Sequence, residues 1–129
     1  MLNSNSNIDV QPSSVVLPSI KNLFIFHQNI RSLRKNFDCL VCNLQSFSSL
    51  PNLIFLSEIW IKENEIKNFA INGYNLYACC NNNYRAGGVA VYVADNVKVK
   101  ISNNFNLQSA DVILTDLIIN GIKISIICV

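Results

Sequence analysis

The hydrophobic residues of this chain change their spacing several times, and each spacing predicts a different element. Residues 23–26 and 53–56 are continuously apolar runs, which are typical of short strands buried on both faces. From Leu33 onward, apolar side chains recur every three or four residues, which predicts an amphipathic helix with Ser32 as N-cap and an end by Pro51. Strand, helix and strand in this order predict a βαβ unit with two parallel strands.

The second half of the chain alternates apolar and polar residues with a period of two, which is the pattern of strands. We expect strands over residues 74–79 and 89–94. Residues 97–101 continue the pattern, and their two lysines should face solvent on an edge strand. Residues 112–119 and 122–129 flank an Asn-Gly dipeptide, which strongly favours a tight hairpin.

The composition limits this chain to one globular domain. It has 129 residues, of which 50% are hydrophobic and 14% charged, so it is too apolar for a disordered chain. Residues 1–20 are polar and serine-rich, and we expect them to form a disordered lead-in to a domain over residues 21–129. The formal net charge is +2. The chain has no basic tail that would indicate nucleic-acid binding and no acidic tail that would indicate a solvating segment.

The sequence also carries expectations about the compartment. The N-terminus lacks the basic and apolar segments of a secretory signal. The most apolar stretch, residues 112–129, contains Asp116 and Lys123, which argues against a membrane helix. Five cysteines without an export signal indicate reduced thiols, and the Cys39-x-x-Cys42 pair falls in the predicted helix, where packing is expected instead of zinc binding. We expect an intracellular protein, in the nucleus or cytoplasm, that is neither secreted nor membrane-bound.

Polar residues follow both strands of the predicted βαβ unit. Asn29 comes after the first apolar run, and Glu58 comes after the second. The carboxyl ends of parallel strands lie at one edge of a sheet, which is where open α/β sheets bind ligands, so we expect Asn29 and Glu58 to converge there. The sole histidine, His27, is expected to be a hydrogen-bonded core residue instead of a general base.

Three segments carry a family resemblance in sequence order. They are residues 26–33 (FHQNIRSL) with 35–38 (KNFD) behind them, residues 56–60 (LSEIW), and residues 73–77 (GYNLY) followed by 84–93 (YRAGGVAVYV). Together they resemble the endonuclease/exonuclease/phosphatase superfamily, and more narrowly the apurinic-endonuclease-like domain of non-LTR (LINE-type, jockey-like) retrotransposons. The resemblance covers about residues 22–129. It implies an α/β fold, the N-terminal half of a four-layer α/β/β/α sandwich with a mixed sheet, here truncated.

The resemblance implies a divalent-metal-dependent phosphodiesterase that nicks DNA, with Mg²⁺ or Mn²⁺ as cofactor and a reverse transcriptase domain in cis. Phosphodiester hydrolysis requires stabilisation of charge on the phosphate oxygens, which a hard cation held by few carboxylates supplies. Glu58 is implied as the catalytic metal carboxylate. Asn29 is implied as its catalytic polar partner, which would contact a phosphate oxygen or the nucleophilic water.

Arg31, Tyr84 and Arg85 are the candidate DNA contacts. Relatives that repair abasic DNA often carry Asp two residues after the motif Asn. Arg31 occupies that position here, which weakens the case for repair activity. Tyr84-Arg85 lie in a polar loop, where an aromatic ring can stack on a base and an arginine can contact phosphate. The alternative is a hairpin loop whose glycines only permit the turn.

Several motifs of this family do not occur in the chain: a Tyr with a Pro-containing turn, an Asp-x-Asn motif and a Ser-Asp-His motif. The last apolar run ends at Val129 without a polar exit. We therefore expect a fragment with little or no nuclease activity of its own, because residues that act as a unit lose their effect together. Two alternatives remain open: a phosphatase or phospholipase of the same superfamily, and a non-catalytic nucleic-acid- or protein-binding relic.

Overall fold

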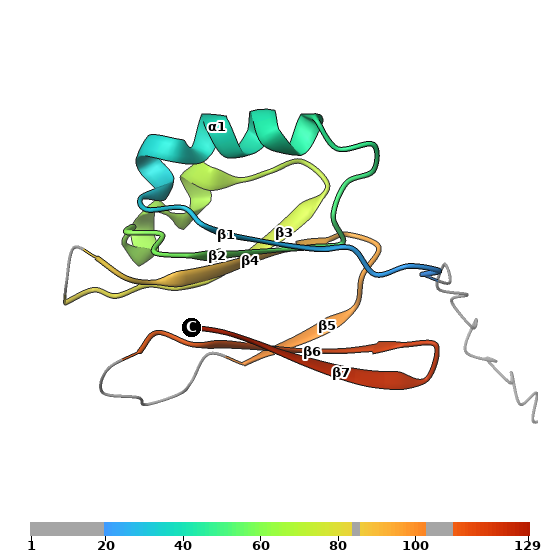
Figure 1. Cartoon of the computed structure of the whole chain (residues 1–129). Helices are drawn as coiled ribbons and strands as arrows, with labels where there is room; N and C mark the ends of the chain where they lie inside the picture. Colours follow the sequence, from blue (N-terminus) through green and yellow to red (C-terminus); the bar gives the residue numbers. More distant parts are fainter. Residues whose placement is uncertain (1–19, 84–85, 103–109) are drawn as a thin grey trace, which may run out of the picture.

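Two sheets and two helices make up residues 20–83, 86–102 and 110–129, the part of the chain that the computed structural model describes. The predicted lead-in lies outside the described residues except for Ile20, so the domain limits stay a prediction. Figure 1 shows three layers: the helices, the first sheet and the second sheet. The elements in chain order are β1 (Ile25–Asn29), α1 (Leu33–Gln45), β2 (Leu53–Ser57), the 3-10 helix η1 (Glu63–Phe69), β3 (Tyr74–Cys79), β4 (Val89–Ala94), β5 (Val99–Ser102), β6 (Ile113–Ile119) and β7 (Ile122–Cys128).

The predicted βαβ unit is confirmed. β1 and β2 pair in parallel, with Asn29 opposite Ser57 at the end of the register. The expectation that the first strand is buried on both faces is wrong, because β1 lies at the edge of the sheet order β1-β2-β4-β3. Phe26 packs toward the helices, whereas the described residues leave the opposite face of β1 open, with Ile25 39% exposed.

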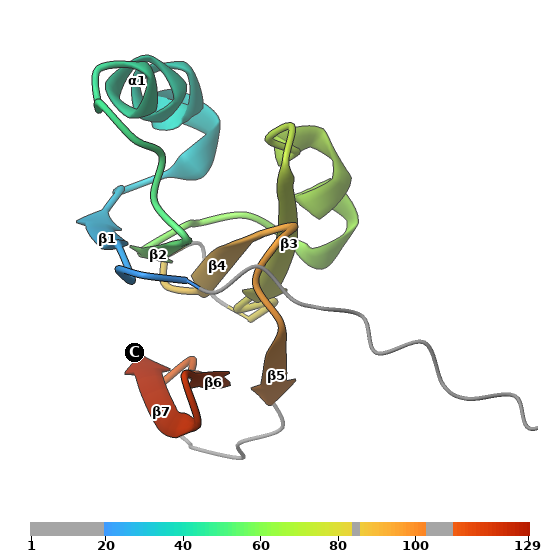
Figure 2. The same ribbon diagram turned by 90° about the vertical axis from the view of Figure 1, so that its right-hand side faces the viewer.

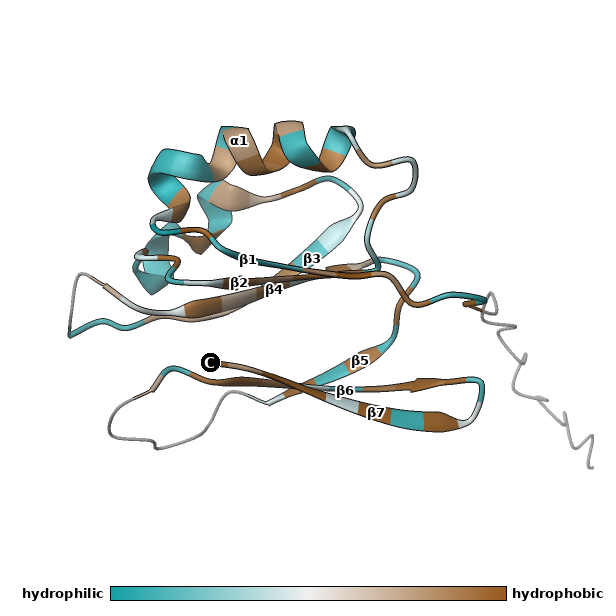
Figure 3. Ribbon diagram, viewed as in Figure 1, coloured by the Kyte–Doolittle hydropathy of each residue, from teal (hydrophilic) through white to brown (hydrophobic). Residues whose placement is uncertain are grey.

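The central strands β2 and β4 form the buried middle of the molecule. They pair antiparallel, and β3 pairs antiparallel with the other side of β4. β4 is mostly brown in Figure 3, as expected for a strand covered on both faces. The odd-numbered residues of β2 and β4 face the second sheet: Leu53, Phe55, Val89, Val91 and Val93. The even-numbered residues face the helices: Ile54, Leu56, Ala90 and Tyr92.

The second sheet has the order β5-β6-β7 and packs beneath the first, as Figure 2 shows. The predicted hairpin is confirmed: β6 and β7 are antiparallel and joined by Asn120 and Gly121. Both residues have a positive φ, 52° and 78°, which two-residue hairpin turns of this kind require. β5 is an edge strand of this sheet, and Lys98 and Lys100 are exposed as expected.

The helix α1 begins at Leu33 as predicted but is capped in a different way. Ser32 has φ 90° and makes no side-chain capping bond. Instead, the backbone N–H groups of Ser32 and Leu33 donate to the carbonyl oxygens of Glu58 (2.9 Å) and Ile59 (2.8 Å). Two of the free donors of the helix start are thereby satisfied by the turn that follows β2. The helix ends at Gln45, before the predicted limit.

The strand directions bring many chain segments to one edge of the molecule. Because β2 is parallel to β1 and antiparallel to β4, the ends of β1 and β2 lie beside the start of β4. The end of β3 is also there, since Cys79 lies opposite Val89. The end of β7 reaches this edge too, with Cys128 Sγ 3.8 Å from the carbonyl oxygen of Leu56. The predicted α/β class with a mixed sheet is confirmed.

Neither of the helices in the described ranges is long and apolar enough to cross a membrane.

Candidate functional site

Asn29 and Glu58 meet at this edge, as their positions after parallel strands predicted. The side-chain Nδ2 of Asn29 donates a hydrogen bond of 2.7 Å to Oε1 of Glu58. The amide carbonyl of Asn29 and the second carboxylate oxygen of Glu58 are not used by this bond, so both can accept from, or coordinate, another group. The contact confirms the predicted convergence. The catalytic roles of the two residues remain predictions.

Glu58 lies in a strained turn. Glu58 and Trp60 have φ values of 55° and 53°. For a residue with a side chain, this left-handed conformation costs roughly 1–2 kcal/mol. Arg31 and Ser32, in the adjacent turn after β1, also have positive φ values, 45° and 90°. Such conformations persist where the surrounding structure enforces them, so the neighbours of the Glu58 turn have to hold it in place.

Two glycines hold the turn from the side of β4. The backbone N–H groups of Ile59 and Trp60 donate to the carbonyl oxygens of Gly88 (3.2 Å) and Gly87 (3.0 Å). Gly88 has φ +83°, and a Cβ there would lie 2.8 Å from Cγ1 of Ile59. Glycine therefore leaves room for the Ile59 side chain and adopts this positive φ without strain.

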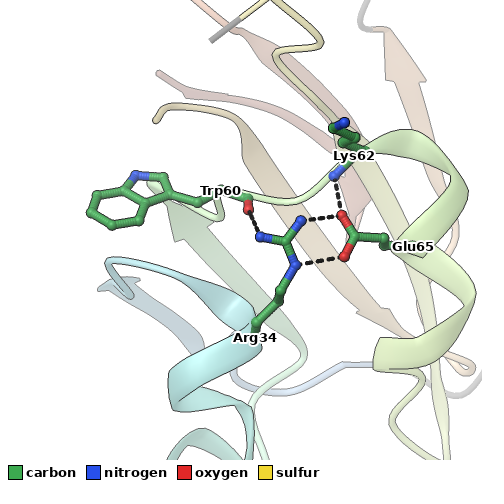
Figure 4. Close-up of polar contacts among 4 residues, drawn as sticks. All are labelled: Arg34, Trp60, Lys62 and Glu65. Atoms are coloured by element: carbon green, nitrogen blue, oxygen red, sulfur yellow. Dashed lines mark hydrogen bonds and ion pairs between the residues drawn. The ribbon is translucent and has the colours of Figure 1, made fainter. Parts of the chain in front are cut away.

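Arg34 holds the turn from the side of α1 (Figure 4). Its Nη1 donates to the carbonyl oxygen of Trp60 at 3.1 Å, and its other guanidinium nitrogens form a bidentate ion pair with Glu65 of η1. Glu65 also accepts a hydrogen bond of 2.8 Å from the backbone N–H of Lys62. The bonds from Arg34, with that from Lys62, lower the pKa of Glu65 to about 2, so its carboxylate is ionised at neutral pH.

A polar cleft of about 980 Å³ opens beside Asn29 and Glu58. The connection between β3 and β4 supplies one wall, and Asp111, from the segment before β6, supplies another. Cys80 also lines the cleft, and burial raises the pKa of its thiol to about 11. The thiol is therefore protonated at neutral pH and is a poor nucleophile. Oxygen donors dominate the chemistry of this cleft.

Of the three candidate DNA-contact residues, only Arg31 belongs to the described part of the chain. Arg31 is exposed in the turn after β1, and it does not appear in the described lining of the cleft. Tyr84 and Arg85 lie outside the described residues. The residues on both sides of that gap, Asn83 and Ala86, do line the cleft. All three DNA-contact assignments therefore remain predictions.

The expectation for His27 is confirmed only in part, because the side chain makes a hydrogen bond but does not belong to the core. Its side chain is exposed on the open face of β1, with Nε2 3.4 Å from Oγ of Ser57. Sequence reasoning also missed Arg34 and Asp111 as parts of the site. Nothing in the local pattern marks either residue, because each acts on a turn that is far away in the chain. Gly87-Gly88 did belong to a quoted motif, but their hydrogen bonds to the Glu58 turn depend on strand register.

The oxygen donors at this edge fit a hard divalent cation. Within the described ranges, no three His, Cys, Asp or Glu side chains come together. Mg²⁺ does not need such a cage, because it keeps several waters and takes one or two carboxylates. The Glu58 carboxylate and the Asn29 carbonyl oxygen are ligands of the right chemical kind. The residues present therefore fit an aquated Mg²⁺ or Mn²⁺.

No family model and no curated protein matches this chain. Solved structures do match it. The structure of the 3′ phosphatase NExo from Neisseria bound to a product DNA hairpin has a TM-score of 0.59 at 14% identity, over 81% of this chain and 40% of that one. An AP endonuclease from Archaeoglobus fulgidus has a TM-score of 0.58 at 18% identity, over 81% and 40%. D. rerio TDP2 complexed with a single-strand DNA product has a TM-score of 0.56 at 14% identity, over 81% and 44%.

These similarities establish the fold. The chain shares the α/β fold of these three solved structures, which is the fold class that the three motifs led us to expect. It spans less than half the length of each of the three chains compared.

The ion pair between Arg34 and Glu65 generates a pH-dependent prediction. Since folding lowers the pKa of Glu65 from 4.5 to about 2, its carboxylate stabilises the folded chain above pH 4.5, and this contribution is lost as the pH falls toward 2. We expect wild type to be more stable than Glu65→Gln at pH 7, with the difference shrinking below pH 4.5. Urea denaturation of both proteins across this pH range measures it.

Glu63→Gln is the matched control, because it removes an exposed carboxylate from the same 3-10 helix. Its urea midpoint should stay close to that of wild type at neutral pH. Equal urea midpoints for wild type and Glu65→Gln at every pH would contradict a stabilising role for the Arg34–Glu65 pair.

Proposed function

We propose that this chain supplies the cation- and phosphate-binding part of a divalent-metal-dependent phosphodiesterase that acts on DNA. The observation that carries the proposal is the 2.7 Å contact between Asn29 and Glu58 in a polar cleft at the carboxyl ends of two parallel strands. The fold supports it, since similar structures include DNA-processing proteins solved with DNA products. This chain spans less than half the length of those structures, so the phosphodiesterase activity of the complete domain is proposed as well.

In this proposal Glu58 binds Mg²⁺ or Mn²⁺ through its carboxylate. Such a cation, when bound, stabilises negative charge on the oxygens of the phosphate. Asn29 orients the Glu58 carboxylate through Nδ2 and offers its carbonyl oxygen to the cation or to a nucleophilic water. Hydrogen bonds hold the turn from Glu58 to Trp60, so the backbone that carries the carboxylate stays in position. Electrostatic stabilisation of negative charge requires such a fixed geometry.

Arg31 and Arg85 would contact phosphates of the DNA, and Tyr84 would stack on a base. The exposure of Arg31, two residues past Asn29, supports a phosphate contact beside the cleft. Asn83 and Ala86, which precede and follow these two residues in the sequence, line the cleft, and this supports a DNA contact by Tyr84 and Arg85. With a formal charge of only +2, the chain would rely on these local contacts and not on a broad basic surface.

Binding of Mn²⁺ to the purified chain tests the metal role of Glu58. We expect Glu58→Gln to weaken Mn²⁺ binding by about tenfold or more, because ligand charge controls affinity for such cations. The glutamine keeps an acceptor oxygen for the Asn29 amide, so the variant removes charge and preserves shape. Electron paramagnetic resonance of free Mn²⁺ measures the affinity.

Glu63→Gln again serves as the control, and it should bind Mn²⁺ as wild type does. If wild type and Glu58→Gln bind Mn²⁺ equally, or wild type binds none at millimolar concentration, Glu58 is not the ligand that we propose.

Binding to a DNA duplex separates the enzyme from the non-catalytic alternative. We expect wild type to bind more tightly in Mg²⁺ than in chelator, whereas Glu58→Ala should lose this difference, because Glu58 would hold the cation whose charge attracts the DNA phosphate. Fluorescence anisotropy measures the affinity, and supercoiled plasmid reports nicking in parallel. We expect little nicking by this chain alone.

Equal, cation-independent binding by both proteins, without nicking by either, would favour a nucleic-acid-binding relic. Mg²⁺-dependent release of phosphate from 3′-phosphorylated DNA without nicking would favour the phosphatase branch.

We further propose that the domain is the DNA-nicking endonuclease of a non-LTR retrotransposon. The forms of residues 26–33 and 56–60 support this branch of the superfamily. We expect the genomic reading frame beyond codon 129 to continue into Asp-x-Asn and Ser-Asp-His motifs and then a reverse transcriptase. Sequencing of the locus and its transcript tests this, and an unrelated continuation would contradict it.

A further inference from the structure

Asp111 connects the second sheet to the first beside the Glu58 turn. Its Oδ2 accepts a hydrogen bond of 2.8 Å from the backbone N–H of Gly88. Gly88 immediately precedes β4. The pairing of β4 with β2 and β3 ends at Val89, one residue after Gly88. Gly88 is buried, so its N–H needs an acceptor from elsewhere, and Asp111 supplies it from the segment before β6.

The bond from Asp111 leads directly to the turn that carries Glu58. The same Gly88 accepts the N–H of Ile59 through its carbonyl oxygen, at 3.2 Å, and Gly87 accepts the N–H of Trp60 at 3.0 Å. The Asp111 carboxylate also packs against Gly87, where an added Cβ would lie 3.0 Å from Oδ2. One side chain therefore lies against both glycines whose carbonyl groups accept the hydrogen bonds of the left-handed turn at Glu58 and Trp60.

We infer that Asp111 is a positioning residue for Glu58: it anchors the Gly87-Gly88 turn, and this turn holds the Glu58 carboxylate beside Asn29. The inference deepens the proposed function and rests on it where metal affinity is concerned. According to this inference, the segment before β6 of the second sheet supports the Glu58 turn, because Asp111 in this segment bonds to Gly88 beside β4. Asp111 acts here through an accepted hydrogen bond, so an uncharged acceptor of the same shape should replace it.

The experiment compares Asp111→Asn and Asp111→Ala in the full chain. Asparagine keeps a side-chain oxygen that can accept the Gly88 N–H, whereas alanine removes it. We expect Asp111→Ala to speed amide hydrogen exchange of Ile59 and Trp60 by about tenfold or more, because their acceptors lose support. We expect it to weaken Mn²⁺ binding by about 10- to 100-fold, the range known for residues that orient a metal ligand. Asp111→Asn should stay within about threefold of wild type in both measurements.

Asp116→Asn is the matched control. Asp116 lies on β6 and bonds to Ser125 and Lys123, so the substitution removes a carboxylate from the same sheet without touching the Glu58 turn. Its exchange at Ile59 and Trp60 and its Mn²⁺ affinity should equal those of wild type.

Two results would overturn the inference. One is an Asp111→Ala protein with wild-type exchange at Ile59 and Trp60. The other is an Asp111→Asn protein that keeps slow exchange but loses Mn²⁺ affinity, since this would make Asp111 a direct charge partner of the cation. The second result decides even if Asp111→Ala does not fold. If wild type binds no Mn²⁺, the proposed function fails, while the exchange rates of the Asp111 variants still decide the positioning role.

Discussion

The short turn from Glu58 to Trp60 is the constraint on which the polar edge of this molecule depends. Two of its residues adopt left-handed backbone conformations that side chains disfavour. Bonds to α1, to the Gly87-Gly88 segment and to Arg34 hold it there. The bonds from Ser32 and Leu33 also satisfy two free donors at the helix start, and the restrained turn places the Glu58 carboxylate beside Asn29. Local strain and long-range hydrogen bonding thus combine to place one carboxylate.

The strand order explains why so many segments reach this turn. A parallel pair, β1 and β2, places two strand ends together, and the antiparallel strand β4 adds its own start at the same edge. The second sheet brings Asp111 and the end of β7 to the same place. Apolar side chains pack on both faces of β2 and β4 and fix these strands in the core. The polar edge is therefore rigid, because it continues directly from the ends of these strands.

Much of the fold could be predicted because its signals are local. The apolar period of α1, the alternation in β4 and the Asn120-Gly121 turn each lie within a short window of sequence. The proximity of Asn29 and Glu58 could be predicted as well, since the direction of a βαβ crossover brings the strand ends together. The 3-10 helix η1 could not, because residues 63–69 contain only two apolar side chains and show no helical period. The edge position of β1, which exposes His27, follows from the sheet order and not from the local composition.

The sequence by itself determined the types of the main elements, the parallel pairing of the first two strands and the two polar residues at their ends. The tertiary structure decided what holds those residues: Arg34 with Glu65, the two glycines, and Asp111. The physical reason is distance along the chain. These contacts join residues 23 to 31 positions apart, so they depend on strand register and sheet packing, which short-range periodicity does not encode.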